Sequence, residues 1–229
     1  MKLKTGAWSF GGKIPNKFER HIAKSVPLYL EGHQIIVRLS DYFLKDGSIC
    51  YDIGCSTGNL LKKINKHTNK KNIKLFGVEK EKSMYHFARS KTKNEKSIKL
   101  INKDFSSITT KKSDLIISYY TFQFINPSMR QNLLTKIFKT LNWGGAFIMF
   151  EKIRGNDARF ENILNSLYLD FKEDNKLSTE DILFKSKSLR GVLEPFSDFG
   201  NLGLMKRAGF RDIQPIMQSL CFKGYLCIK

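Results

Sequence analysis

Apolar residues recur along the chain in two patterns, one typical of buried strands and one typical of helices. Short apolar runs predict strands at residues 48–54, 73–78, 98–102, 114–119 and 145–150. Between them, apolar residues spaced three and four apart predict helices at residues 59–67, 82–90 and 127–141. This strand–helix series predicts an α/β fold, a Rossmann-like doubly wound sheet of about seven strands.

The two flanks of this series have patterns of their own. Residues 18–26 and 28–43 predict helices separated by Pro27, within an N-terminal helical segment at 1–45. Residues 154–196 have a mixed helical pattern, and Ser178-Thr-Glu-Asp181 resembles a capping box, so we expect a helical lid insert there. Two strand-like runs, 213–218 and 221–228, predict a C-terminal antiparallel hairpin, and residues 195–203 predict a Pro/Gly connection. We expect residues 1–229 to form one domain.

Composition narrows the class of protein. The chain has 229 residues, of which 41% are hydrophobic, 12% aromatic and 27% charged, and this excludes a disordered or coiled-coil chain. No run approaches the roughly 18 apolar residues of a membrane span, and the first residues lack the apolar core of a secretory signal. We therefore expect a cytoplasmic protein that does not bind membranes. Its four cysteines form no CxxC pair, which favours neither a metal site nor disulfides.

The charge is strongly basic and unevenly distributed. Forty Lys and Arg residues against 21 Asp and Glu give a net charge of +19, and residues 61–112 hold 16 basic and four acidic side chains. Such a surface could bind nucleic acid. However, only nine of the forty basic residues are Arg, and aromatic residues do not interleave with the basic ones. A solvated face is therefore favoured over a nucleic-acid site.

The main chemical signal follows the first predicted strand. Gly54 and Gly58 stand four apart at a strand-to-helix turn, where the backbone can approach a ligand closely. The spacing lacks the G-x-G-x-x-G pattern that cradles a pyrophosphate, so a ligand without phosphate such as S-adenosylmethionine (SAM) fits better. Glu79 after the second strand could accept from the ribose hydroxyls. Asp104 after the third could accept from the adenine amino group, beside the ring of Phe105.

A resemblance to a known family covers nearly the whole chain. It rests on these blocks: Trp8-x-Phe10, Ser25-Val-Pro-Leu-Tyr29, Tyr51-Asp-Ile-Gly-Cys-Ser56, Phe122-Gln-Phe124, Leu141-Asn-x-Gly-Gly-Ala146, Glu151-Lys152, Asp170-Phe-Lys172 and Ala208-Gly-Phe210. The chain resembles the class I SAM-dependent methyltransferases and, within them, the carboxy-SAM synthases that serve tRNA wobble-uridine modification. The resemblance implies a homodimer that binds SAM or a derivative, S-adenosylhomocysteine or carboxy-SAM. The expected cofactor residues are Tyr29, Asp52, Gly54, Cys55, Ser56, Gly58, Glu79, Lys80, Asp104, Phe105 and Tyr119.

Two departures from the family pattern affect the expected reaction. Tyr119 replaces the family's Asn, and Ser186 falls where the family has the arginine that holds the extra carboxylate. The resemblance implies carboxylation of the sulfonium methyl from prephenate, and the new carboxylate needs a fixed cation. Only Lys185 and Lys187 flank Ser186, and neighbouring helix positions point about 100° apart.

The missing arginine makes methyl transfer to a small-molecule acceptor the favoured function. Carboxy-SAM synthesis from prephenate is the alternative, and RNA methylation is the third. Candidate catalytic residues are Tyr119, Glu151 and His21. Candidate substrate residues are Tyr120, Lys185 and Lys187.

Overall fold

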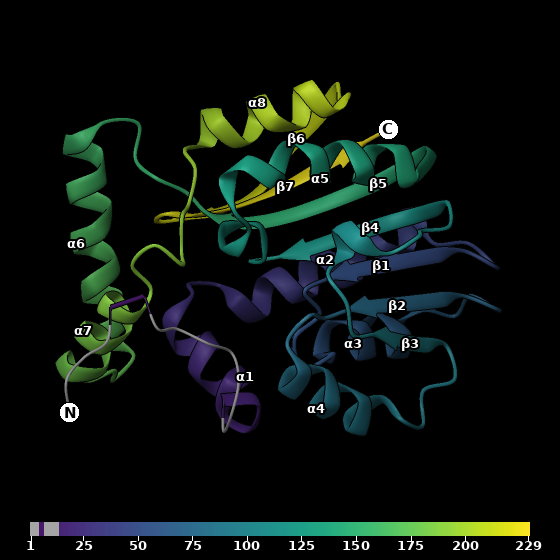
Figure 1. Cartoon of the computed structure of the whole chain (residues 1–229), viewed down its shortest axis with the longest axis horizontal. Coiled ribbons are helices and arrows are strands. Elements are labelled where there is room, and N and C mark those ends of the chain that lie inside the picture. The colour runs from purple at the N-terminus through teal and green to yellow at the C-terminus, as the bar shows by residue number, and fades with distance from the viewer. Residues whose placement is uncertain (1–4, 7–13) are drawn as a thin grey trace.

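The computed structural model describes residues 5–6 and 14–229, and in this part of the chain a seven-stranded sheet lies between two layers of helices (Figure 1). The strands are β1 (Ile49–Ile53), β2 (Lys74–Val78), β3 (Ile98–Ile101), β4 (Ser113–Tyr119), β5 (Leu141–Lys152), β6 (Asp212–Ser219) and β7 (Phe222–Ile228). Their order is β3-β2-β1-β4-β5-β7-β6. The first five strands run parallel, and β7 is antiparallel to β5 and β6. The predicted α/β fold with a C-terminal antiparallel hairpin is confirmed.

The helices cover both faces of the sheet and one end of it. Within the described residues they are α1 (Ile14–Ser25), α2 (Tyr29–Phe43), α3 (Asn59–His67), α4 (Lys82–Thr92), α5 (Pro127–Thr140), α6 (Ala158–Asp174), α7 (Thr179–Ser188) and α8 (Asp198–Ala208), with short 3-10 turns η1 (Phe105–Ser107) and η2 (Phe122–Phe124). Helices α2 and α3 pack on one face of the sheet, and α5 and α8 pack on the other. No helix among the described residues has the length and hydropathy needed to cross a membrane.

Side chains of the central strands point alternately to the two faces of the sheet and form the two halves of the core. In β5, Ile148 packs toward α2 and α3, whereas its neighbours Phe147 and Met149 pack toward α5 and α8. All three side chains are buried, as expected for a parallel strand with helices on both faces. This is why the sequence pattern of the central strands is a continuous apolar run.

The register of the parallel strands brings their carboxyl ends to one edge of the sheet. Ile53, the last residue of β1, pairs with Val78 at the end of β2 and with Ser118 near the end of β4. The segments that follow these strands therefore meet at the same edge, where ligands of open α/β sheets bind.

Helices α6 and α7 stand at the left of Figure 1, beyond this edge of the sheet. Both begin at a side-chain cap: Asp157 accepts from the amide of Phe160 at 3.0 Å, and Ser178 accepts from the amide of Asp181 at 3.1 Å. Helix α6 has no fully buried residue. The two helices lie in the segment 154–196 that was expected to form a lid, and that role stays a prediction. The Trp8-x-Phe10 block lies outside the described residues.

Helix α8 corrects the expectation of a plain connection at residues 195–203. Its two glycines, Gly200 and Gly203, lower the helix propensity of the sequence. The helix forms because Leu204 and Met205 bury their side chains against α5 and the sheet. Its start is also capped, since Ser197 accepts from the amide of Gly200 at 3.1 Å.

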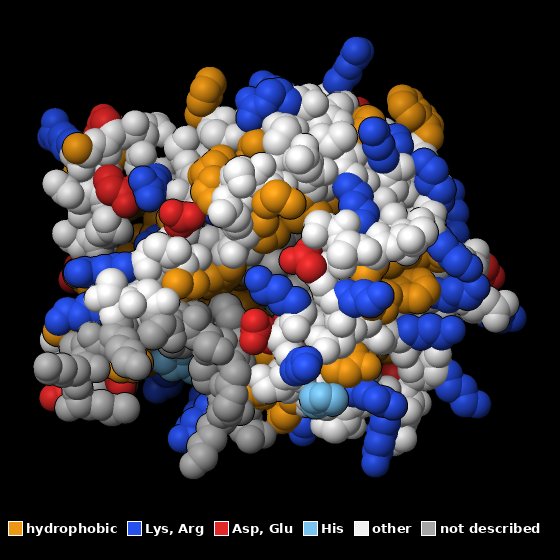
Figure 2. All heavy atoms as spheres, viewed as in Figure 1, with side chains coloured by type: hydrophobic (Ala, Val, Ile, Leu, Met, Phe, Trp, Pro, Cys, Tyr) orange, Lys and Arg blue, Asp and Glu red, His pale blue; other side chains and the backbone are white. Residues whose placement is uncertain are grey.

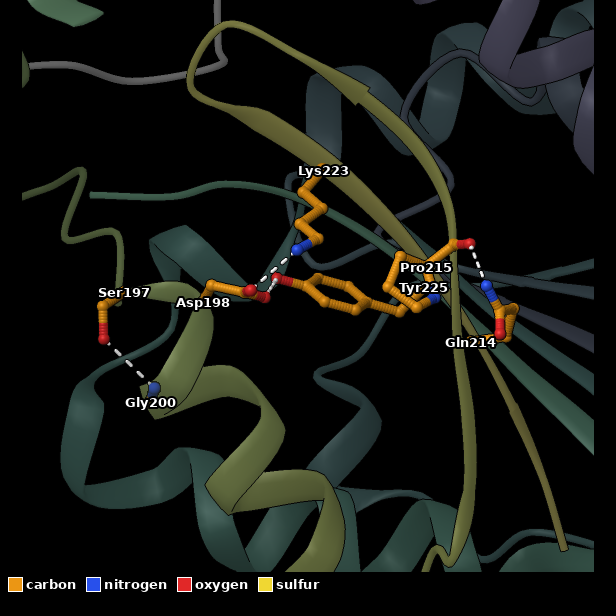
Figure 3. A network of polar contacts seen from close by, with 7 residues as sticks. All are labelled: Ser197, Asp198, Gly200, Gln214, Pro215, Lys223 and Tyr225. Atoms are coloured by element: carbon orange, nitrogen blue, oxygen red, sulfur yellow. Dashed lines mark hydrogen bonds and ion pairs between the residues drawn. The ribbon is translucent and has the colours of Figure 1, made fainter. Parts of the chain in front are cut away.

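The first turn of α8 is tied to β7 by the polar network in Figure 3. The two carboxylate oxygens of Asp198 accept from Lys223 Nζ and from Tyr225 Oη, each at 2.7 Å. Lys223 and Tyr225 alternate with side chains that face the other side of β7, so both reach the α8 face of the sheet. The network fixes α8 on the sheet at its N-terminal end.

Candidate active site

The turn between β1 and α3 brings backbone to the edge of a large cavity. Gly54 has a φ of +70°, and a Cβ there would lie 2.6 Å from Cγ2 of Thr121, so only glycine fits. The amide of Gly54 donates to the carbonyl of Val78 at 2.8 Å, which fixes the turn against the end of β2. Gly54, Cys55 and Ser56 all line the cavity, and the amides of Cys55 and Ser56 are likewise bonded within the protein, to the carbonyl of Val78 and to Glu79.

Glu79 closes this turn from the neighbouring strand. Its Oε2 accepts from the amide of Ser56 and its Oε1 accepts from the amide of Glu81, both at 2.9 Å. Burial raises the pKa of Glu79, although these two hydrogen bonds oppose the shift. Burial, and next the charge of Glu79, raise the pKa of the nearby Asp52 to about 7. The two carboxyl groups therefore form an acidic pair at the floor of the cavity.

The turn after β3 supplies a flat apolar wall. Phe105 is buried, and its ring meets Tyr51 edge-on with centroids 5.8 Å apart. Asp104 is exposed and caps η1, because its Oδ1 accepts from the amide of Ser106 at 2.8 Å. Lys136 of α5 holds the turn from below by donating to the carbonyls of Phe105, Ser106 and Ile108. The predicted adenine position thus combines a ring and a carboxylate on a fixed turn.

The cavity has a volume of about 570 Å³ and lies between the carboxyl ends of the strands and helices α1, α2 and α7. This is a usual size for a small-molecule site. It brings together most of the residues that the sequence singled out. These are His21, Tyr29, Asp52, Gly54, Cys55, Ser56, Glu79, Lys80, Asp104, Phe105, Tyr119, Tyr120 and Lys185.

Three residues singled out from the sequence lie outside the cavity lining. Glu151 is buried beneath it and accepts from the amide of Phe122 at 2.9 Å, and burial raises its pKa to about 8. Lys187 lies on a different face of α7 than Lys185 does. Its backbone carbonyl accepts a hydrogen bond from the amide of Gly6. Gly58 begins α3, and a Cβ there would contact Thr92 and Ala88 instead of a ligand. These positions argue for structural roles.

Three tyrosine rings, of Tyr29 at the start of α2 and of Tyr119 and Tyr120 at the end of β4, pack against one another, with the ring of Tyr119 tilted against the other two. Tyr119 donates from Oη to the carbonyl of Tyr29, and its ring centroid lies 5.1 Å from that of Tyr29 and 4.6 Å from that of Tyr120. Burial raises the pKa of Tyr119, so its hydroxyl stays protonated and occupied. The hydroxyl of Tyr120 is buried and has no hydrogen-bond partner among the described residues. A buried orphan hydroxyl of this kind is costly unless a ligand or water satisfies it.

Lys185 of α7 extends to the roof of the cavity, opposite the turn. Its Nζ lies 3.1 Å from Nε2 of His21 and donates to Oγ of Ser25 at 3.4 Å. Burial, and next the charge of Lys185, lower the pKa of His21, so its ring is neutral and accepts from the ammonium group. Burial, and next the charge of Lys172, lower the pKa of Lys185 to about 8. Of the two lysines beside Ser186, the structure therefore turns Lys185 inward.

Several lining residues were not found from the sequence. Helix α1 contributes Glu19, which accepts from Oγ1 of Thr57 and from Nδ2 of Asn59 at the glycine turn. Lys152 and Tyr168 also line the cavity, from the end of β5 and from α6. The Asp-Phe-Lys block was a signal for this region of α6, whereas nothing in the pattern of α1 pointed to Glu19.

Charged side chains outside the cavity are widely spread. Figure 2 shows Lys and Arg side chains on the side of the molecule where Figure 1 places β1 to β4, mostly separated by uncharged atoms. This face carries much of the basic segment 61–112. Its assignment as a solvated face stays a prediction.

Solved structures share the fold at low sequence identity. A putative O-methyltransferase from Nostoc punctiforme superimposes with a TM-score of 0.68 at 15% identity, covering 100% of this chain and 64% of that one. A SAM-dependent methyltransferase from Aquifex aeolicus gives a TM-score of 0.62 at 14% identity, covering 93% of this chain and 97% of that one. These likenesses concern the fold, which is that of class I methyltransferases.

Sequence relatives identify the family. Residues 50–145 match a family described as "Methyltransferase domain". The carboxy-S-adenosyl-L-methionine synthase of Staphylococcus epidermidis is 35% identical, over 97% of both chains. The enzyme of the same name from Campylobacter jejuni is 34% identical, over 97% of this chain and 94% of the relative. The protein is thus a SAM-dependent enzyme with SAM or a derivative as its cofactor, and it belongs to the carboxy-SAM synthase family of the class I SAM-dependent methyltransferases.

Proposed function

We propose that the chain is a carboxy-SAM synthase, which moves a carboxyl group from prephenate to the S-methyl carbon of SAM. The observation that carries this proposal is the ammonium group of Lys185 in the roof of the cavity. The sequence favoured methyl transfer because Ser186 replaces the family's arginine. A buried carboxylate without a cation costs several kcal/mol, and Lys185 removes that objection.

The residues of the cavity fit SAM. The carboxylate of Glu79 keeps acceptor capacity beyond its two amide bonds and is placed for the ribose hydroxyls. Phe105 offers a ring face for adenine, with Asp104 beside it as an acceptor for the amino group. The turn Gly54–Ser56, which lines the cavity, is placed for the methionine part. SAM supplies a methyl carbon activated by the sulfonium charge.

The overall reaction balances without a further reagent. Prephenate loses one carboxyl group as CO₂ and its ring hydroxyl as hydroxide, and the aromatic product is phenylpyruvate. The S-methyl group loses a proton, which leaves with the hydroxide as water, and gains the CO₂ through a new carbon–carbon bond. In this proposal Lys185 holds the carboxylate of the product as a point charge. The apolar walls around Tyr29 and Tyr119 exclude water from the reacting carbon.

Methyl transfer to a small acceptor is the second candidate, and His21 favours it. A neutral imidazole at the roof of the cavity could accept a proton from an acceptor hydroxyl or amine. In this structure its Nε2 already lies 3.1 Å from Lys185 Nζ, which argues for the first candidate. RNA methylation, the third function expected from the sequence, gains no support from the cavity.

The test is product analysis with matched lysine variants. Purified protein is incubated with SAM and prephenate, and the nucleoside products are identified by mass spectrometry. We expect carboxy-SAM, with Lys185→Met lowering its formation by at least about tenfold, because a charge-assisted contact is lost. Lys187→Met, on the outer face of α7, should form the product at the rate of the unsubstituted protein. Release of S-adenosylhomocysteine with a methylated acceptor, and no carboxy-SAM, would decide for methyl transfer.

The proposal includes a cytoplasmic homodimer. The four cysteines, Cys50, Cys55, Cys221 and Cys227, are buried and unpaired, which suits a reducing compartment. Apolar side chains of α6 and α7 are about half exposed, and these are Phe160, Ile163, Leu167, Leu183 and Phe184. Such a surface supports self-association. Light scattering should give twice the chain mass, falling to one chain mass for Leu167→Glu, and a monomeric unsubstituted protein would contradict the dimer.

A further inference from the structure

A second group of basic side chains lies beside the cavity, around the ring of Tyr168. Lys172 Nζ lies 3.8 Å and Lys152 Nζ 4.9 Å from the centroid of this ring. The ring is held in place because Tyr168 Oη donates to the carbonyl of Ser25 at 2.7 Å. Two ammonium groups on one aromatic ring concentrate positive charge at this point of the molecule.

Neither of these two lysines forms an ion pair with an acidic side chain of the described residues. The ion pairs within the described residues join Asp41 to His67 and Asp198 to Lys223, and neither involves Lys152 or Lys172. Lys172 is half-buried, and burial, and next the charge of Lys152, lower its pKa to about 8. Two cations brought together without a counter-ion repel each other, so an anion bound between them would be stabilised by both.

The orphan hydroxyl of Tyr120 belongs to the same corner of the cavity. The ring of Phe222 meets that of Tyr120 at 5.7 Å and that of Tyr168 at 5.2 Å, so one ring contacts both tyrosines. Tyr120 is 7% exposed, has a left-handed φ of 58°, and keeps no hydrogen-bond partner within the described residues. A ligand in this corner would give that hydroxyl a partner. We call Lys152, Lys172, Tyr168, Tyr120 and Phe222 the Tyr168 corner, of which all but Lys172 line the cavity and Lys172 lies against the Tyr168 ring.

We propose that the Tyr168 corner binds the second, anionic substrate by a carboxylate that is not transferred, with its unsaturated ring against the aromatic walls. This inference rests on the proposed function and extends it. Lys185 holds the carboxylate formed on SAM, whereas Lys152 and Lys172 hold the carboxylate that stays on the donor. A donor with two carboxylates is thereby oriented with one held and the other directed toward the S-methyl carbon. The site selects a dicarboxylate over a monocarboxylate with the same ring.

The test compares binding and turnover in three variants. Lys172→Met removes the charge from the Tyr168 corner, Lys172→Arg restores it, and Arg159→Met removes a charge from the exposed side of the same helix. Prephenate binding is measured by calorimetry with S-adenosylhomocysteine present, and the KM for prephenate is measured by carboxy-SAM formation. We expect Lys172→Met to weaken prephenate binding and to raise its KM by about tenfold or more. Lys172→Arg should recover most of the loss, and Arg159→Met should change neither quantity. The affinity for S-adenosylhomocysteine should be the same in all three.

The outcomes separate this inference from the proposed function. Carboxy-SAM formation with unchanged prephenate affinity in Lys172→Met would overturn the Tyr168 corner and leave the proposed function standing. Prephenate binding that depends on Lys172, without carboxy-SAM formation, would support the corner and overturn the reaction. Failure of the unsubstituted protein to bind prephenate, or an equal loss in Arg159→Met, would also overturn the corner.

Discussion

Gly32 offers a sharp test of how the site is packed. It lies within α2, directly beneath the ring of Tyr119, and a Cβ at this position would overlap the Tyr119 hydroxyl and lie 3.1 Å from the ring carbons Cε2 and Cζ. The hydroxyl cannot move freely, because it donates to the carbonyl of Tyr29. We therefore expect Gly32→Ala to displace Tyr119 from the wall of the cavity.

The change in the free energy of unfolding is the sum of one stabilising and two destabilising contributions. Alanine is favoured over glycine inside a helix by about 1 kcal/mol. Overpacking a buried site costs about 1–3 kcal/mol, and the loss of the hydrogen bond to Tyr29 costs about 1 kcal/mol more. The net expectation is a loss of about 1–3 kcal/mol in the free energy of unfolding. For a chain of this length, that lowers the melting temperature by roughly 2–12 °C.

Thermal and urea unfolding of matched variants would measure this effect. Gly203→Ala in α8 is the control, because a Cβ there meets only the flexible end of Arg207 at 3.1 Å, and its stability should stay equal or rise. Tyr119→Phe removes the clashing hydroxyl but keeps the ring, so the double variant with Gly32→Ala should lose less stability than the sum of the two single changes. Gly32→Ala behaving like Gly203→Ala, or additive losses, would refute the packing argument.

Three further predictions concern the cofactor, the lysines and α8. Glu79→Ala should weaken SAM binding by about tenfold or more, since a charged acceptor for the ribose and the brace of the glycine turn are both lost, and unchanged affinity in calorimetry would remove the assignment. Burial lowers the pKa values of Lys172 and Lys185 to about 8, so both side chains are charged below that pH. As the pH rises through about 8, prephenate affinity should therefore fall with the charge of Lys172 and carboxy-SAM affinity with the charge of Lys185, and a flat profile would contradict the role of the lysine concerned. Asp198→Ala should lower the free energy of unfolding by about 2–3 kcal/mol, because Lys223 loses its partner, whereas the exposed Asp212→Ala should change it by less than about 0.5 kcal/mol in urea unfolding. Equal effects of the two changes would contradict the network.

Much of the fold was predictable because its central strands have one consistent apolar pattern. β1, β2 and β4 read as buried runs, and the parallel arrangement follows from the helices between them. Helix α8 was missed for a physical reason. Its two glycines weaken the local helical signal, and the helix is stabilised by packing on α5, which no local pattern records.

The candidate site likewise contains residues that could be predicted from the sequence and residues that could not. Glu79 could be placed from the sequence, because a residue that follows a parallel strand must lie at the carboxyl edge of the sheet. The direction of the Lys185 side chain could not be predicted from the sequence. Neighbouring helix positions point about 100° apart, so a shift of one residue separates a side chain in the cavity from one in solvent. The Tyr168 corner joins β5, α6, the residue after β4 and the residue at the start of β7, and such a meeting of distant segments depends on tertiary packing alone.

The hydrogen bonds of Glu19 have a kinetic meaning. Helix α1 lines the cavity and is tied by Glu19 to Thr57 and Asn59 at the glycine turn. If α1 must move for SAM to enter and leave, we expect these hydrogen bonds to contribute to one barrier that both steps share. A weaker tether would speed association and dissociation together and leave the equilibrium affinity nearly unchanged.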